Sequence, residues 1–200
     1  MSSDNGSPTP SSKQRGRRWA HLRDSLRQSL GLVMVGVWTA LGTPKAGWWH
    51  IGAILAVAGI LIRLWASGHI KKNKILATDG PYGYVRHPLY VGNFLIAVGF
   101  AAASGLWWAW LMLVVFWLIF YPNAIHDEDT KLERLFGDAW RHWAAKTKAL
   151  IPRFSAYRDT NQAESESNSW SFGQSLRSNG EPVIVVLLLA CLYLLYRWIA

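Results

Sequence analysis

The sequence has only one cysteine, Cys191, among its 200 residues. A single cysteine cannot form an internal disulfide or a cysteine-based metal site. Clustered cysteines, an HExxH motif and a DxD pattern are also missing, so we expect no metal centre. The 21 lysines and arginines do not belong to a recognisable nucleic-acid-binding module, and we therefore exclude nucleic acid as a partner.

Apolar sequence is abundant instead, with 51% hydrophobic residues and 13 tryptophans. The apolar residues gather in long runs with aromatic residues at their ends, which is typical of a multi-pass membrane protein. About five runs are present, at residues 29–41, 48–66, 89–104, 106–121 and 183–199. We therefore predict an all-α membrane protein with about five transmembrane helices, the shorter of which borrow flanking residues or meet a thinned bilayer.

The basic residues indicate how these runs are oriented. Six precede the first run, four lie between residues 67 and 88, and eight lie between 122 and 182, whereas the opposite side has only Lys45 and Arg197. Because cytoplasmic loops carry the excess of Lys and Arg, we expect a cytosolic N-terminus and an external C-terminus. The formal charge of +9 is thus explained first by topology.

Composition divides the chain into four parts. Residues 1–28 are polar and basic, which predicts a disordered cytosolic tail rather than a signal peptide. Residues 29–154 form the predicted membrane domain. Residues 155–181 are a polar linker, and residues 182–200 form an additional C-terminal transmembrane helix.

Two features inside the membrane domain concern its cytosolic side. Only Ser104 and Gly105 separate the third and fourth runs, which predicts a helical hairpin with almost no loop. Residues 132–144 repeat apolar side chains at the spacing of one helical face, which predicts an amphipathic helix on the membrane or over the cytosolic ends of the spans. Gly137 weakens that helix by about 1 kcal/mol relative to alanine.

A polar cluster at residues 80–92 lies at a membrane boundary, where burying polar groups is costly. Pro88 is suited to the first turn of a helix, with Arg86 and His87 just before it and Tyr90 within that turn. One interpretation is an interfacial anchor, with snorkelling side chains and a capping histidine. The other is a ligand site, because the free N–H groups of a helix N-terminus favour anions.

Three acidic residues, 127–129, follow the fourth run. They are explained simply as solvated acids at a helix N-terminus. The predicted hairpin offers a second explanation, because it brings residues 86–90 and 122–128 together. A site with His87 and Tyr90 on one wall and Glu128 on the other would hold a polar, charged ligand.

These residues resemble those of a known family. Gly80-Pro81-Tyr82, the sequence RHPLYVG at 86–92, EDTKL at 128–132 and Phe136-Gly137 resemble the isoprenylcysteine carboxyl methyltransferase and phospholipid methyltransferase families. The family signature is RHPxYxG followed, after a helical hairpin, by EExxLxxxFG. The resemblance covers about residues 60–154. Asp129 stands for the second glutamate, and Trp140 and Trp143 stand where tyrosines are usual.

The resemblance implies an integral membrane enzyme that uses S-adenosylmethionine and binds it in a cytosolic pocket. Aromatic faces and a carboxylate suit the sulfonium cation and ribose hydroxyls of this cofactor. By position in the motif, the cofactor contacts are Tyr82, His87, Pro88, Leu89, Tyr90 and Glu128, with Lys74, Ile75, Leu76 and Ala77 contributing less directly.

The acceptor side is less defined. Eukaryotic isoprenylcysteine methyltransferases have an arginine four residues before the retained glutamate, where this chain has Ala124. Arg63, Asn123 and His126 are the candidate substrate-side residues, although Arg63 is also explained as an interfacial snorkeller. No catalytic base is assigned.

Three interpretations of function remain open. The first is methylation of a lipophilic acceptor that enters from the bilayer, as in isoprenylcysteine carboxyl methyltransferases. The second is N-methylation of phospholipid or other lipid amines. The third is a non-catalytic membrane scaffold protein that retains the hairpin. The related sterol reductases use NADPH, but their larger number of spans argues against that activity.

Overall fold

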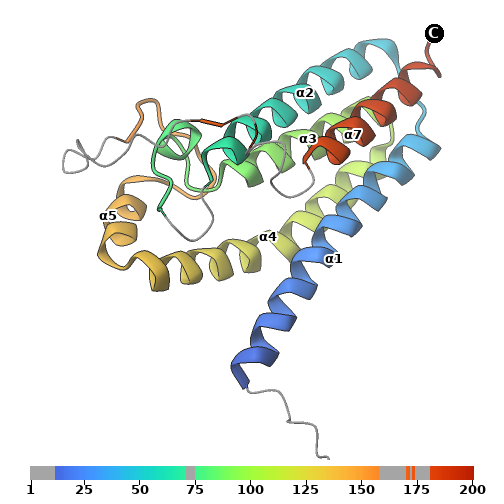
Figure 1. Cartoon of the computed structure of the whole chain (residues 1–200). Helices are drawn as coiled ribbons and strands as arrows, with labels where there is room; N and C mark the ends of the chain where they lie inside the picture. Colours follow the sequence, from blue (N-terminus) through green and yellow to red (C-terminus); the bar gives the residue numbers. More distant parts are fainter. Residues whose placement is uncertain (1–11, 71–74, 158–169, 172, 174–180) are drawn as a thin grey trace, which may run out of the picture.

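The computed structural model describes residues 12–70, 75–157, 170–171, 173 and 181–200, and side chains from Arg23 onward. The described part is helical, with no strand in these ranges, which confirms the predicted all-α class. Its elements are α1 (Ser12–Leu41), α2 (Ala46–His69), the 3₁₀ turn η1 (Gly80–Gly83), α3 (Pro88–Ser104), α4 (Trp107–Phe136), α5 (Asp138–Lys146) and α7 (Glu181–Tyr196). Helices α2, α3 and α7 lie side by side, and α1 packs across α4 (Figure 1).

Two helices of the described residues, α2 and α4, are long and apolar enough to cross a membrane by length and composition. The predicted count of five is therefore not met. Helices α3 and α7 are apolar, but they have only 17 and 16 residues. Helix α1 has 30 residues, and its first half is polar and basic. These three helices complete a bundle around the two candidate spans.

The start of α1 corrects the prediction of a disordered tail over residues 1–28. Residues 12–28 are helical, while residues 1–11 lie outside the described part. This segment has no proline after Pro10 and is rich in Arg, Leu and Gln, which favour helix. The apolar half of α1 is already packed in the bundle, so each added residue extends an existing helix without a new nucleation cost.

Helices α2 and α3 meet along an antiparallel seam of glycines. A Cβ on Gly52 would lie 2.3 Å from the carbonyl oxygen of Gly99, and one on Gly59 would lie 2.6 Å from that of Gly92. Small residues let two apolar helices bring their backbones this close, as is common between membrane helices. Around the seam, residues of α1, α2, α3, α4 and α7 form the main apolar core, which includes Trp38, Phe100 and Leu195.

The connection between α3 and α4 confirms the predicted short hairpin loop. Helix α3 ends at Ser104 and α4 begins at Trp107. Gly105 between them has a left-handed φ of 69°. A Cβ there would lie 2.3 Å from the carbonyl oxygen of Thr43, so glycine fits both the turn and the close approach of the α1–α2 loop.

Helix α4 differs from the prediction in two ways. It continues without interruption through Pro122 to Phe136, so the acidic residues 127–129 lie inside a helix and not at its N-terminus. The predicted amphipathic helix is also divided, because Gly137, with φ 52°, ends α4 and α5 starts at the next residue. The polar half of α4 changes direction relative to the apolar half and leads to α5 (Figure 1), as expected near an internal proline.

Candidate functional site

The loop that carries residues 80–87 is held against the end of α2. Gly80 has φ 52°, and a Cβ on it would lie 2.4 Å from Nε2 of His69. His69 is the buried last residue of α2, and its Nδ1 lies 3.4 Å from a carboxylate oxygen of Asp79. His69 thus supports the turn that precedes the site.

A second support comes from the chain after α5, and sequence reasoning did not find it. The amides of Arg86 and His87 donate to the carbonyl oxygens of Lys148 and Ala149, at 2.9 and 3.0 Å. Further along the same segment, the amide of Tyr157 donates to the carbonyl oxygen of Gly83 at 2.7 Å. These bonds fix the backbone directly before α3. The family resemblance extends to about residue 154, which was the available signal for this support.

Tyr82 joins the loop to an apolar cluster between α2 and α5. Trp143, which is buried, donates from Nε1 to the carbonyl oxygen of Tyr82 at 3.2 Å. Leu76, Ala77 and Leu89 pack in the same cluster. Burial, with a smaller effect of the nearby Glu128 carboxylate, raises the pKa of Tyr82 well above its usual value. The Tyr82 hydroxyl is therefore held neutral beside the site.

His87 lies at the centre of the site. It is the N-cap residue of α3, and its backbone carbonyl accepts from the amide of Tyr90 at 3.0 Å. Its buried ring faces two successive carboxylates of α4, with Nε2 3.0 Å from Asp129 and Nδ1 3.7 Å from Glu128. Arg86 adds a longer contact to the other Asp129 oxygen at 3.5 Å. The predicted juxtaposition of residues 86–90 with Glu128 is thus present.

Aromatic rings continue the site along α3 and α4. The Tyr90 ring stacks on His87, with centroids 5.3 Å apart, and meets Tyr121 edge-on at 5.3 Å. Trp117 stacks on Tyr121 at 3.5 Å. The guanidinium of Arg27 lies 4.9 Å from the Tyr90 centroid and 5.6 Å from that of Tyr121. Helix α1 therefore contributes a cation that the sequence had not placed at the site.

Arg63 connects the site to the C-terminal helix. Its Nε lies 3.2 Å from Glu181, the fully buried first residue of α7, and its guanidinium also bonds Asn93. The Arg63 stem passes over Gly92, where a Cβ would lie 2.7 Å from Cγ. Asn93 in turn interacts with Tyr121. Arg63 is thus a mostly buried link between α2, α3 and α7, and not a snorkelling residue.

The predicted residues separate into three groups. Tyr82, His87, Pro88, Leu89, Tyr90 and Glu128 converge, with Leu76 and Ala77 behind them. Ile75 is exposed, and Lys74 lies outside the described residues. Asn123 donates to the carbonyl oxygen of Ile119 and His126 is exposed; within the described ranges, neither forms a hydrogen bond or ion pair with His87 or Glu128.

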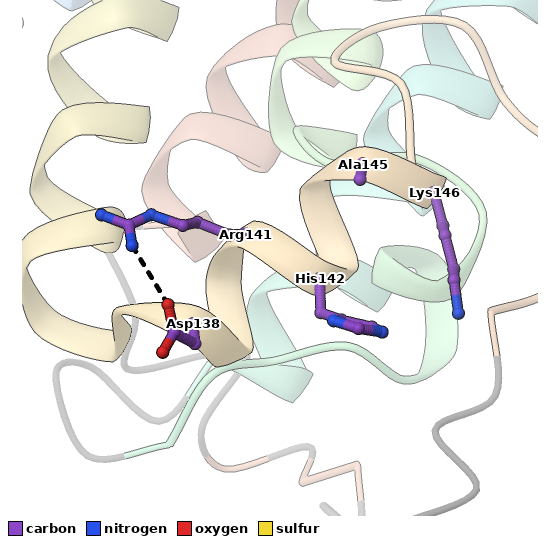
Figure 2. A pocket seen from close by; sticks show the side chains of 5 residues that line it. All are labelled: Asp138, Arg141, His142, Ala145 and Lys146. Carbon is purple, nitrogen blue, oxygen red and sulfur yellow. Dashed lines mark hydrogen bonds and ion pairs between the residues drawn. The ribbon is translucent and has the colours of Figure 1, made fainter.

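A shallow hollow of about 320 Å³ lies on the outer face of α5. Figure 2 shows its lining, with Arg141 turned toward Asp138 at 3.0 Å. Arg141 also donates to Glu133 at 2.8 Å, so its cation is already paired at the surface. Trp143 of the same helix points the other way, toward Tyr82. We assign this hollow no part in the site.

Comparisons with known proteins match the part of the chain that contains the site. The profile of the phospholipid methyltransferase family matches residues 48–139. The chain is 37% identical over 110 residues to the cobalt-zinc-cadmium resistance protein CzcN of Cupriavidus metallidurans, covering 54% of this chain and 49% of that protein. It is 34% identical over 143 residues to the nickel-cobalt-cadmium resistance protein NccN of Alcaligenes xylosoxydans xylosoxydans, covering 62% and 67%.

A third relative is an enzyme by name. The protein-S-isoprenylcysteine O-methyltransferase of Schizosaccharomyces pombe is 30% identical over 142 residues, covering 68% of this chain and 60% of the enzyme. The matched stretch therefore spans about half of CzcN and less than two thirds of the yeast enzyme. No solved structure matches the chain significantly. The chain belongs to the family of phospholipid methyltransferases and isoprenylcysteine carboxyl methyltransferases.

Proposed function

We propose that the chain is an integral membrane methyltransferase that uses S-adenosylmethionine and methylates a lipophilic acceptor. The convergence of His87 and Tyr90 with Glu128 is the observation that carries this proposal. The site lies where α3 begins and where the polar half of α4 leaves the apolar half, which is the end of the bundle richest in basic residues. By the distribution of Lys and Arg this end faces the cytosol, as does the N-terminus.

The donor set fits this cofactor. Glu128 has a side chain 44% exposed, so one carboxylate of the site is open to a ligand, and the largely buried rings of Tyr90 and Tyr121 are the aromatic groups of the site. A carboxylate suits ribose hydroxyls, and aromatic faces suit a sulfonium. Arg86 also has a buried Nε without a hydrogen-bond partner among the described residues. Tyr82, His87, Pro88, Leu89, Tyr90 and Glu128 would hold the cofactor, with residues 74–77 at its edge.

When bound, S-adenosylmethionine supplies an electrophilic methyl group. The chain's own part is to orient the two reactants and exclude water, an effect that positions reacting atoms for in-line transfer. A carboxylate or thiolate acceptor is already deprotonated and needs no base. An amine acceptor must lose a proton, for which His87 and His126 are the candidates. His126 is exposed, whereas His87 is held between two carboxylates.

Binding to the detergent-purified protein tests the cofactor directly. Calorimetry with S-adenosylmethionine should show binding to the wild type that is lost in His87→Ala and Glu128→Ala. His142→Ala is the matched control, because His142 is an exposed histidine on the outer face of α5. If the wild type does not bind, or if the two site variants bind as it does, the protein is a non-catalytic scaffold instead.

The acceptor is tested by transfer of a radiolabelled methyl group. Fractionated membrane lipids, prenylcysteine analogues and lipid amines are offered in parallel. We expect the label in a lipophilic fraction, because the site adjoins the apolar helices α3 and α4. Label in the prenylcysteine analogue supports O-methylation, and label in a lipid amine supports N-methylation. Label that enters only water-soluble acceptors would contradict entry from the bilayer.

The two bacterial relatives suggest a physiological setting, because their names describe resistance to cobalt, cadmium and other metals. We propose that methyl transfer by this chain serves such resistance. Cells that lack the chain would then lose tolerance to cobalt and cadmium, and His87→Ala would fail to restore it. Restoration by His87→Ala would instead separate metal tolerance from the proposed site.

A further inference from the structure

The polar half of α1 turns a single described side chain inward. Between Arg23 and Leu30 every residue is exposed except Arg27, whose side chain is 10% exposed. An amphipathic helix usually directs an apolar residue toward its neighbours. Here the inward position holds a cation, and it points at Tyr90 and Tyr121 of the proposed site.

A neighbouring contact shows where α1 lies relative to the site. Arg23, one turn earlier on α1, forms an ion pair with Asp127 of α4 at 2.8 Å. Asp127 immediately precedes Glu128 and Asp129, which face His87. The helix that carries Arg27 therefore lies beside the acidic wall of the site, and this exposed ion pair itself adds little to stability.

The guanidinium of Arg27 has donor capacity to spare. Nη1 donates to the Tyr90 hydroxyl at 3.4 Å, and Nη2 lies 3.4 Å from Asp24, a carboxylate that is 59% exposed. Both distances are longer than the 2.7–2.9 Å typical of a charge-assisted hydrogen bond. By contrast, Arg63 reaches a fully buried carboxylate and Asn93. A guanidinium has five N–H donors, so Arg27 can accept a further anionic partner.

We propose that Arg27 forms a carboxylate-binding subsite of the proposed methyltransferase site. The planar fork of a guanidinium matches a carboxylate through two parallel hydrogen bonds, and the Tyr90 and Tyr121 rings lie against this guanidinium. The carboxylate comes either from the methionine part of the cofactor or from an acidic acceptor. This inference rests on the proposed function only where the carboxylate belongs to the cofactor. An acidic amphiphile would bind at Arg27 whether or not the chain is a methyltransferase.

Two matched pairs of probes distinguish these sources without measuring activity. S-adenosylhomocysteine carries the amino-acid carboxylate, and 5′-methylthioadenosine lacks it. Oleate carries a carboxylate on an apolar chain, and methyl oleate has lost its charge. Each probe is titrated into detergent-purified wild type, Arg27→Gln and Arg23→Gln. Arg23→Gln removes the same charge from the same helix, at an exposed position.

For a cofactor carboxylate, Arg27→Gln should weaken S-adenosylhomocysteine binding by roughly 10- to 100-fold, the size expected for a hydrogen bond to a charged group, and should leave 5′-methylthioadenosine unaffected. For an acceptor carboxylate, the variant should instead weaken oleate binding and leave methyl oleate and both nucleosides unaffected. Arg23→Gln should bind all four probes as the wild type does.

The proposal is overturned if Arg27→Gln binds both carboxylate probes as tightly as the wild type. It is also overturned if Arg23→Gln weakens the same probe equally, because the effect is then general charge. If Arg27→Gln is not monodisperse, Arg27→Lys replaces it, since lysine keeps the charge and loses the fork. If the wild type binds oleate but neither nucleoside, the proposed methyltransferase function is contradicted. The oleate and methyl oleate pair then still tests the Arg27 subsite.

Discussion

Helix α3 presents two different faces to its neighbours. Toward α2 it offers glycines, and backbone meets backbone along the seam of Gly52 with Gly99 and Gly59 with Gly92. Toward the polar half of α4 and α1 it offers His87 and Tyr90, which meet carboxylates and a guanidinium. The first contact leaves no room for a side chain, whereas the second is made of side chains with hydrogen-bonding capacity. We infer that the seam fixes the scaffold and the polar face carries the chemistry.

The largest expected effect is at the seam. In Gly99→Ala the new Cβ would lie 2.5 Å from the carbonyl oxygen of Gly52, and the atom in the way is backbone. We expect destabilisation at or beyond the upper end of the about 1–3 kcal/mol seen for overpacked cores. The measurement is the recovery of monodisperse protein and its thermal unfolding in detergent.

Gly47→Ala is the matched control for the seam, because it lies in the same helix pair with nothing within 4 Å of its Cβ. It should be neutral or stabilising by up to about 1 kcal/mol. Equal stability of the two alanine variants would show that α2 and α3 do not pack as closely as described.

The next effect concerns the buried ion pair behind the polar face. In Glu181→Ala, Arg63 keeps its charge in a buried place without its carboxylate, which should cost about 3–5 kcal/mol of stability. The double variant Arg63→Met with Glu181→Leu should recover much of this loss, because apolar residues replace both charges. Thermal unfolding of the three proteins checks the prediction. Wild-type stability of Glu181→Ala would mean that α7 is not joined to α2 through this pair.

The two carboxylates beside His87 should behave differently. Asp129 is 18% exposed and contacts both His87 and Arg86, so Asp129→Asn should lower stability by about 1–3 kcal/mol. Glu128 is 44% exposed, and Glu128→Gln should change stability by no more than about 0.5 kcal/mol while weakening S-adenosylmethionine binding roughly tenfold or more. Thermal unfolding and calorimetry on both variants check this prediction. A loss of stability in Glu128→Gln together with a loss of binding in Asp129→Asn would contradict it.

Local sequence signals predicted much of this arrangement. Pro88 indicated the start of α3, Gly105 indicated the turn before α4, and both lie where expected. The helix beyond Pro122 was not foreseen, because proline usually ends or kinks a helix and the acidic residues 127–129 read as a new start. The structure shows one bent helix, in which Asp129 bonds to His87 and Glu128 lies 3.7 Å from it, and these contacts hold the polar half in place.

The side chains that come from far along the chain were the harder part. Arg27 and Glu181 lie outside residues 48–139, and no local spacing relates either one to the RHPxYxG motif. Arg63 in an apolar run was a visible signal, since a buried cation requires a partner. The identity of that partner depends on how α7 packs, which is a tertiary property.

The smallest effect is in the pH dependence of stability, at the edge of the polar face. Burial raises the pKa of the Tyr82 hydroxyl well above its usual value of 10.0, so the folded state keeps this proton after the unfolded chain has lost it. The stability that a neutral Tyr82 provides is therefore fully present below about pH 10 and is lost progressively as the pH rises above it. Tyr82→Phe should lose less stability than the wild type between pH 9 and about pH 11. Thermal unfolding of both proteins across this range measures the difference, with the more exposed Tyr84→Phe as the control that should follow the wild type. Parallel curves of stability against pH for Tyr82→Phe and the wild type would show that the Tyr82 hydroxyl is open to water. The hydroxyl would then lie on the ligand side of the site and not in the apolar cluster behind it.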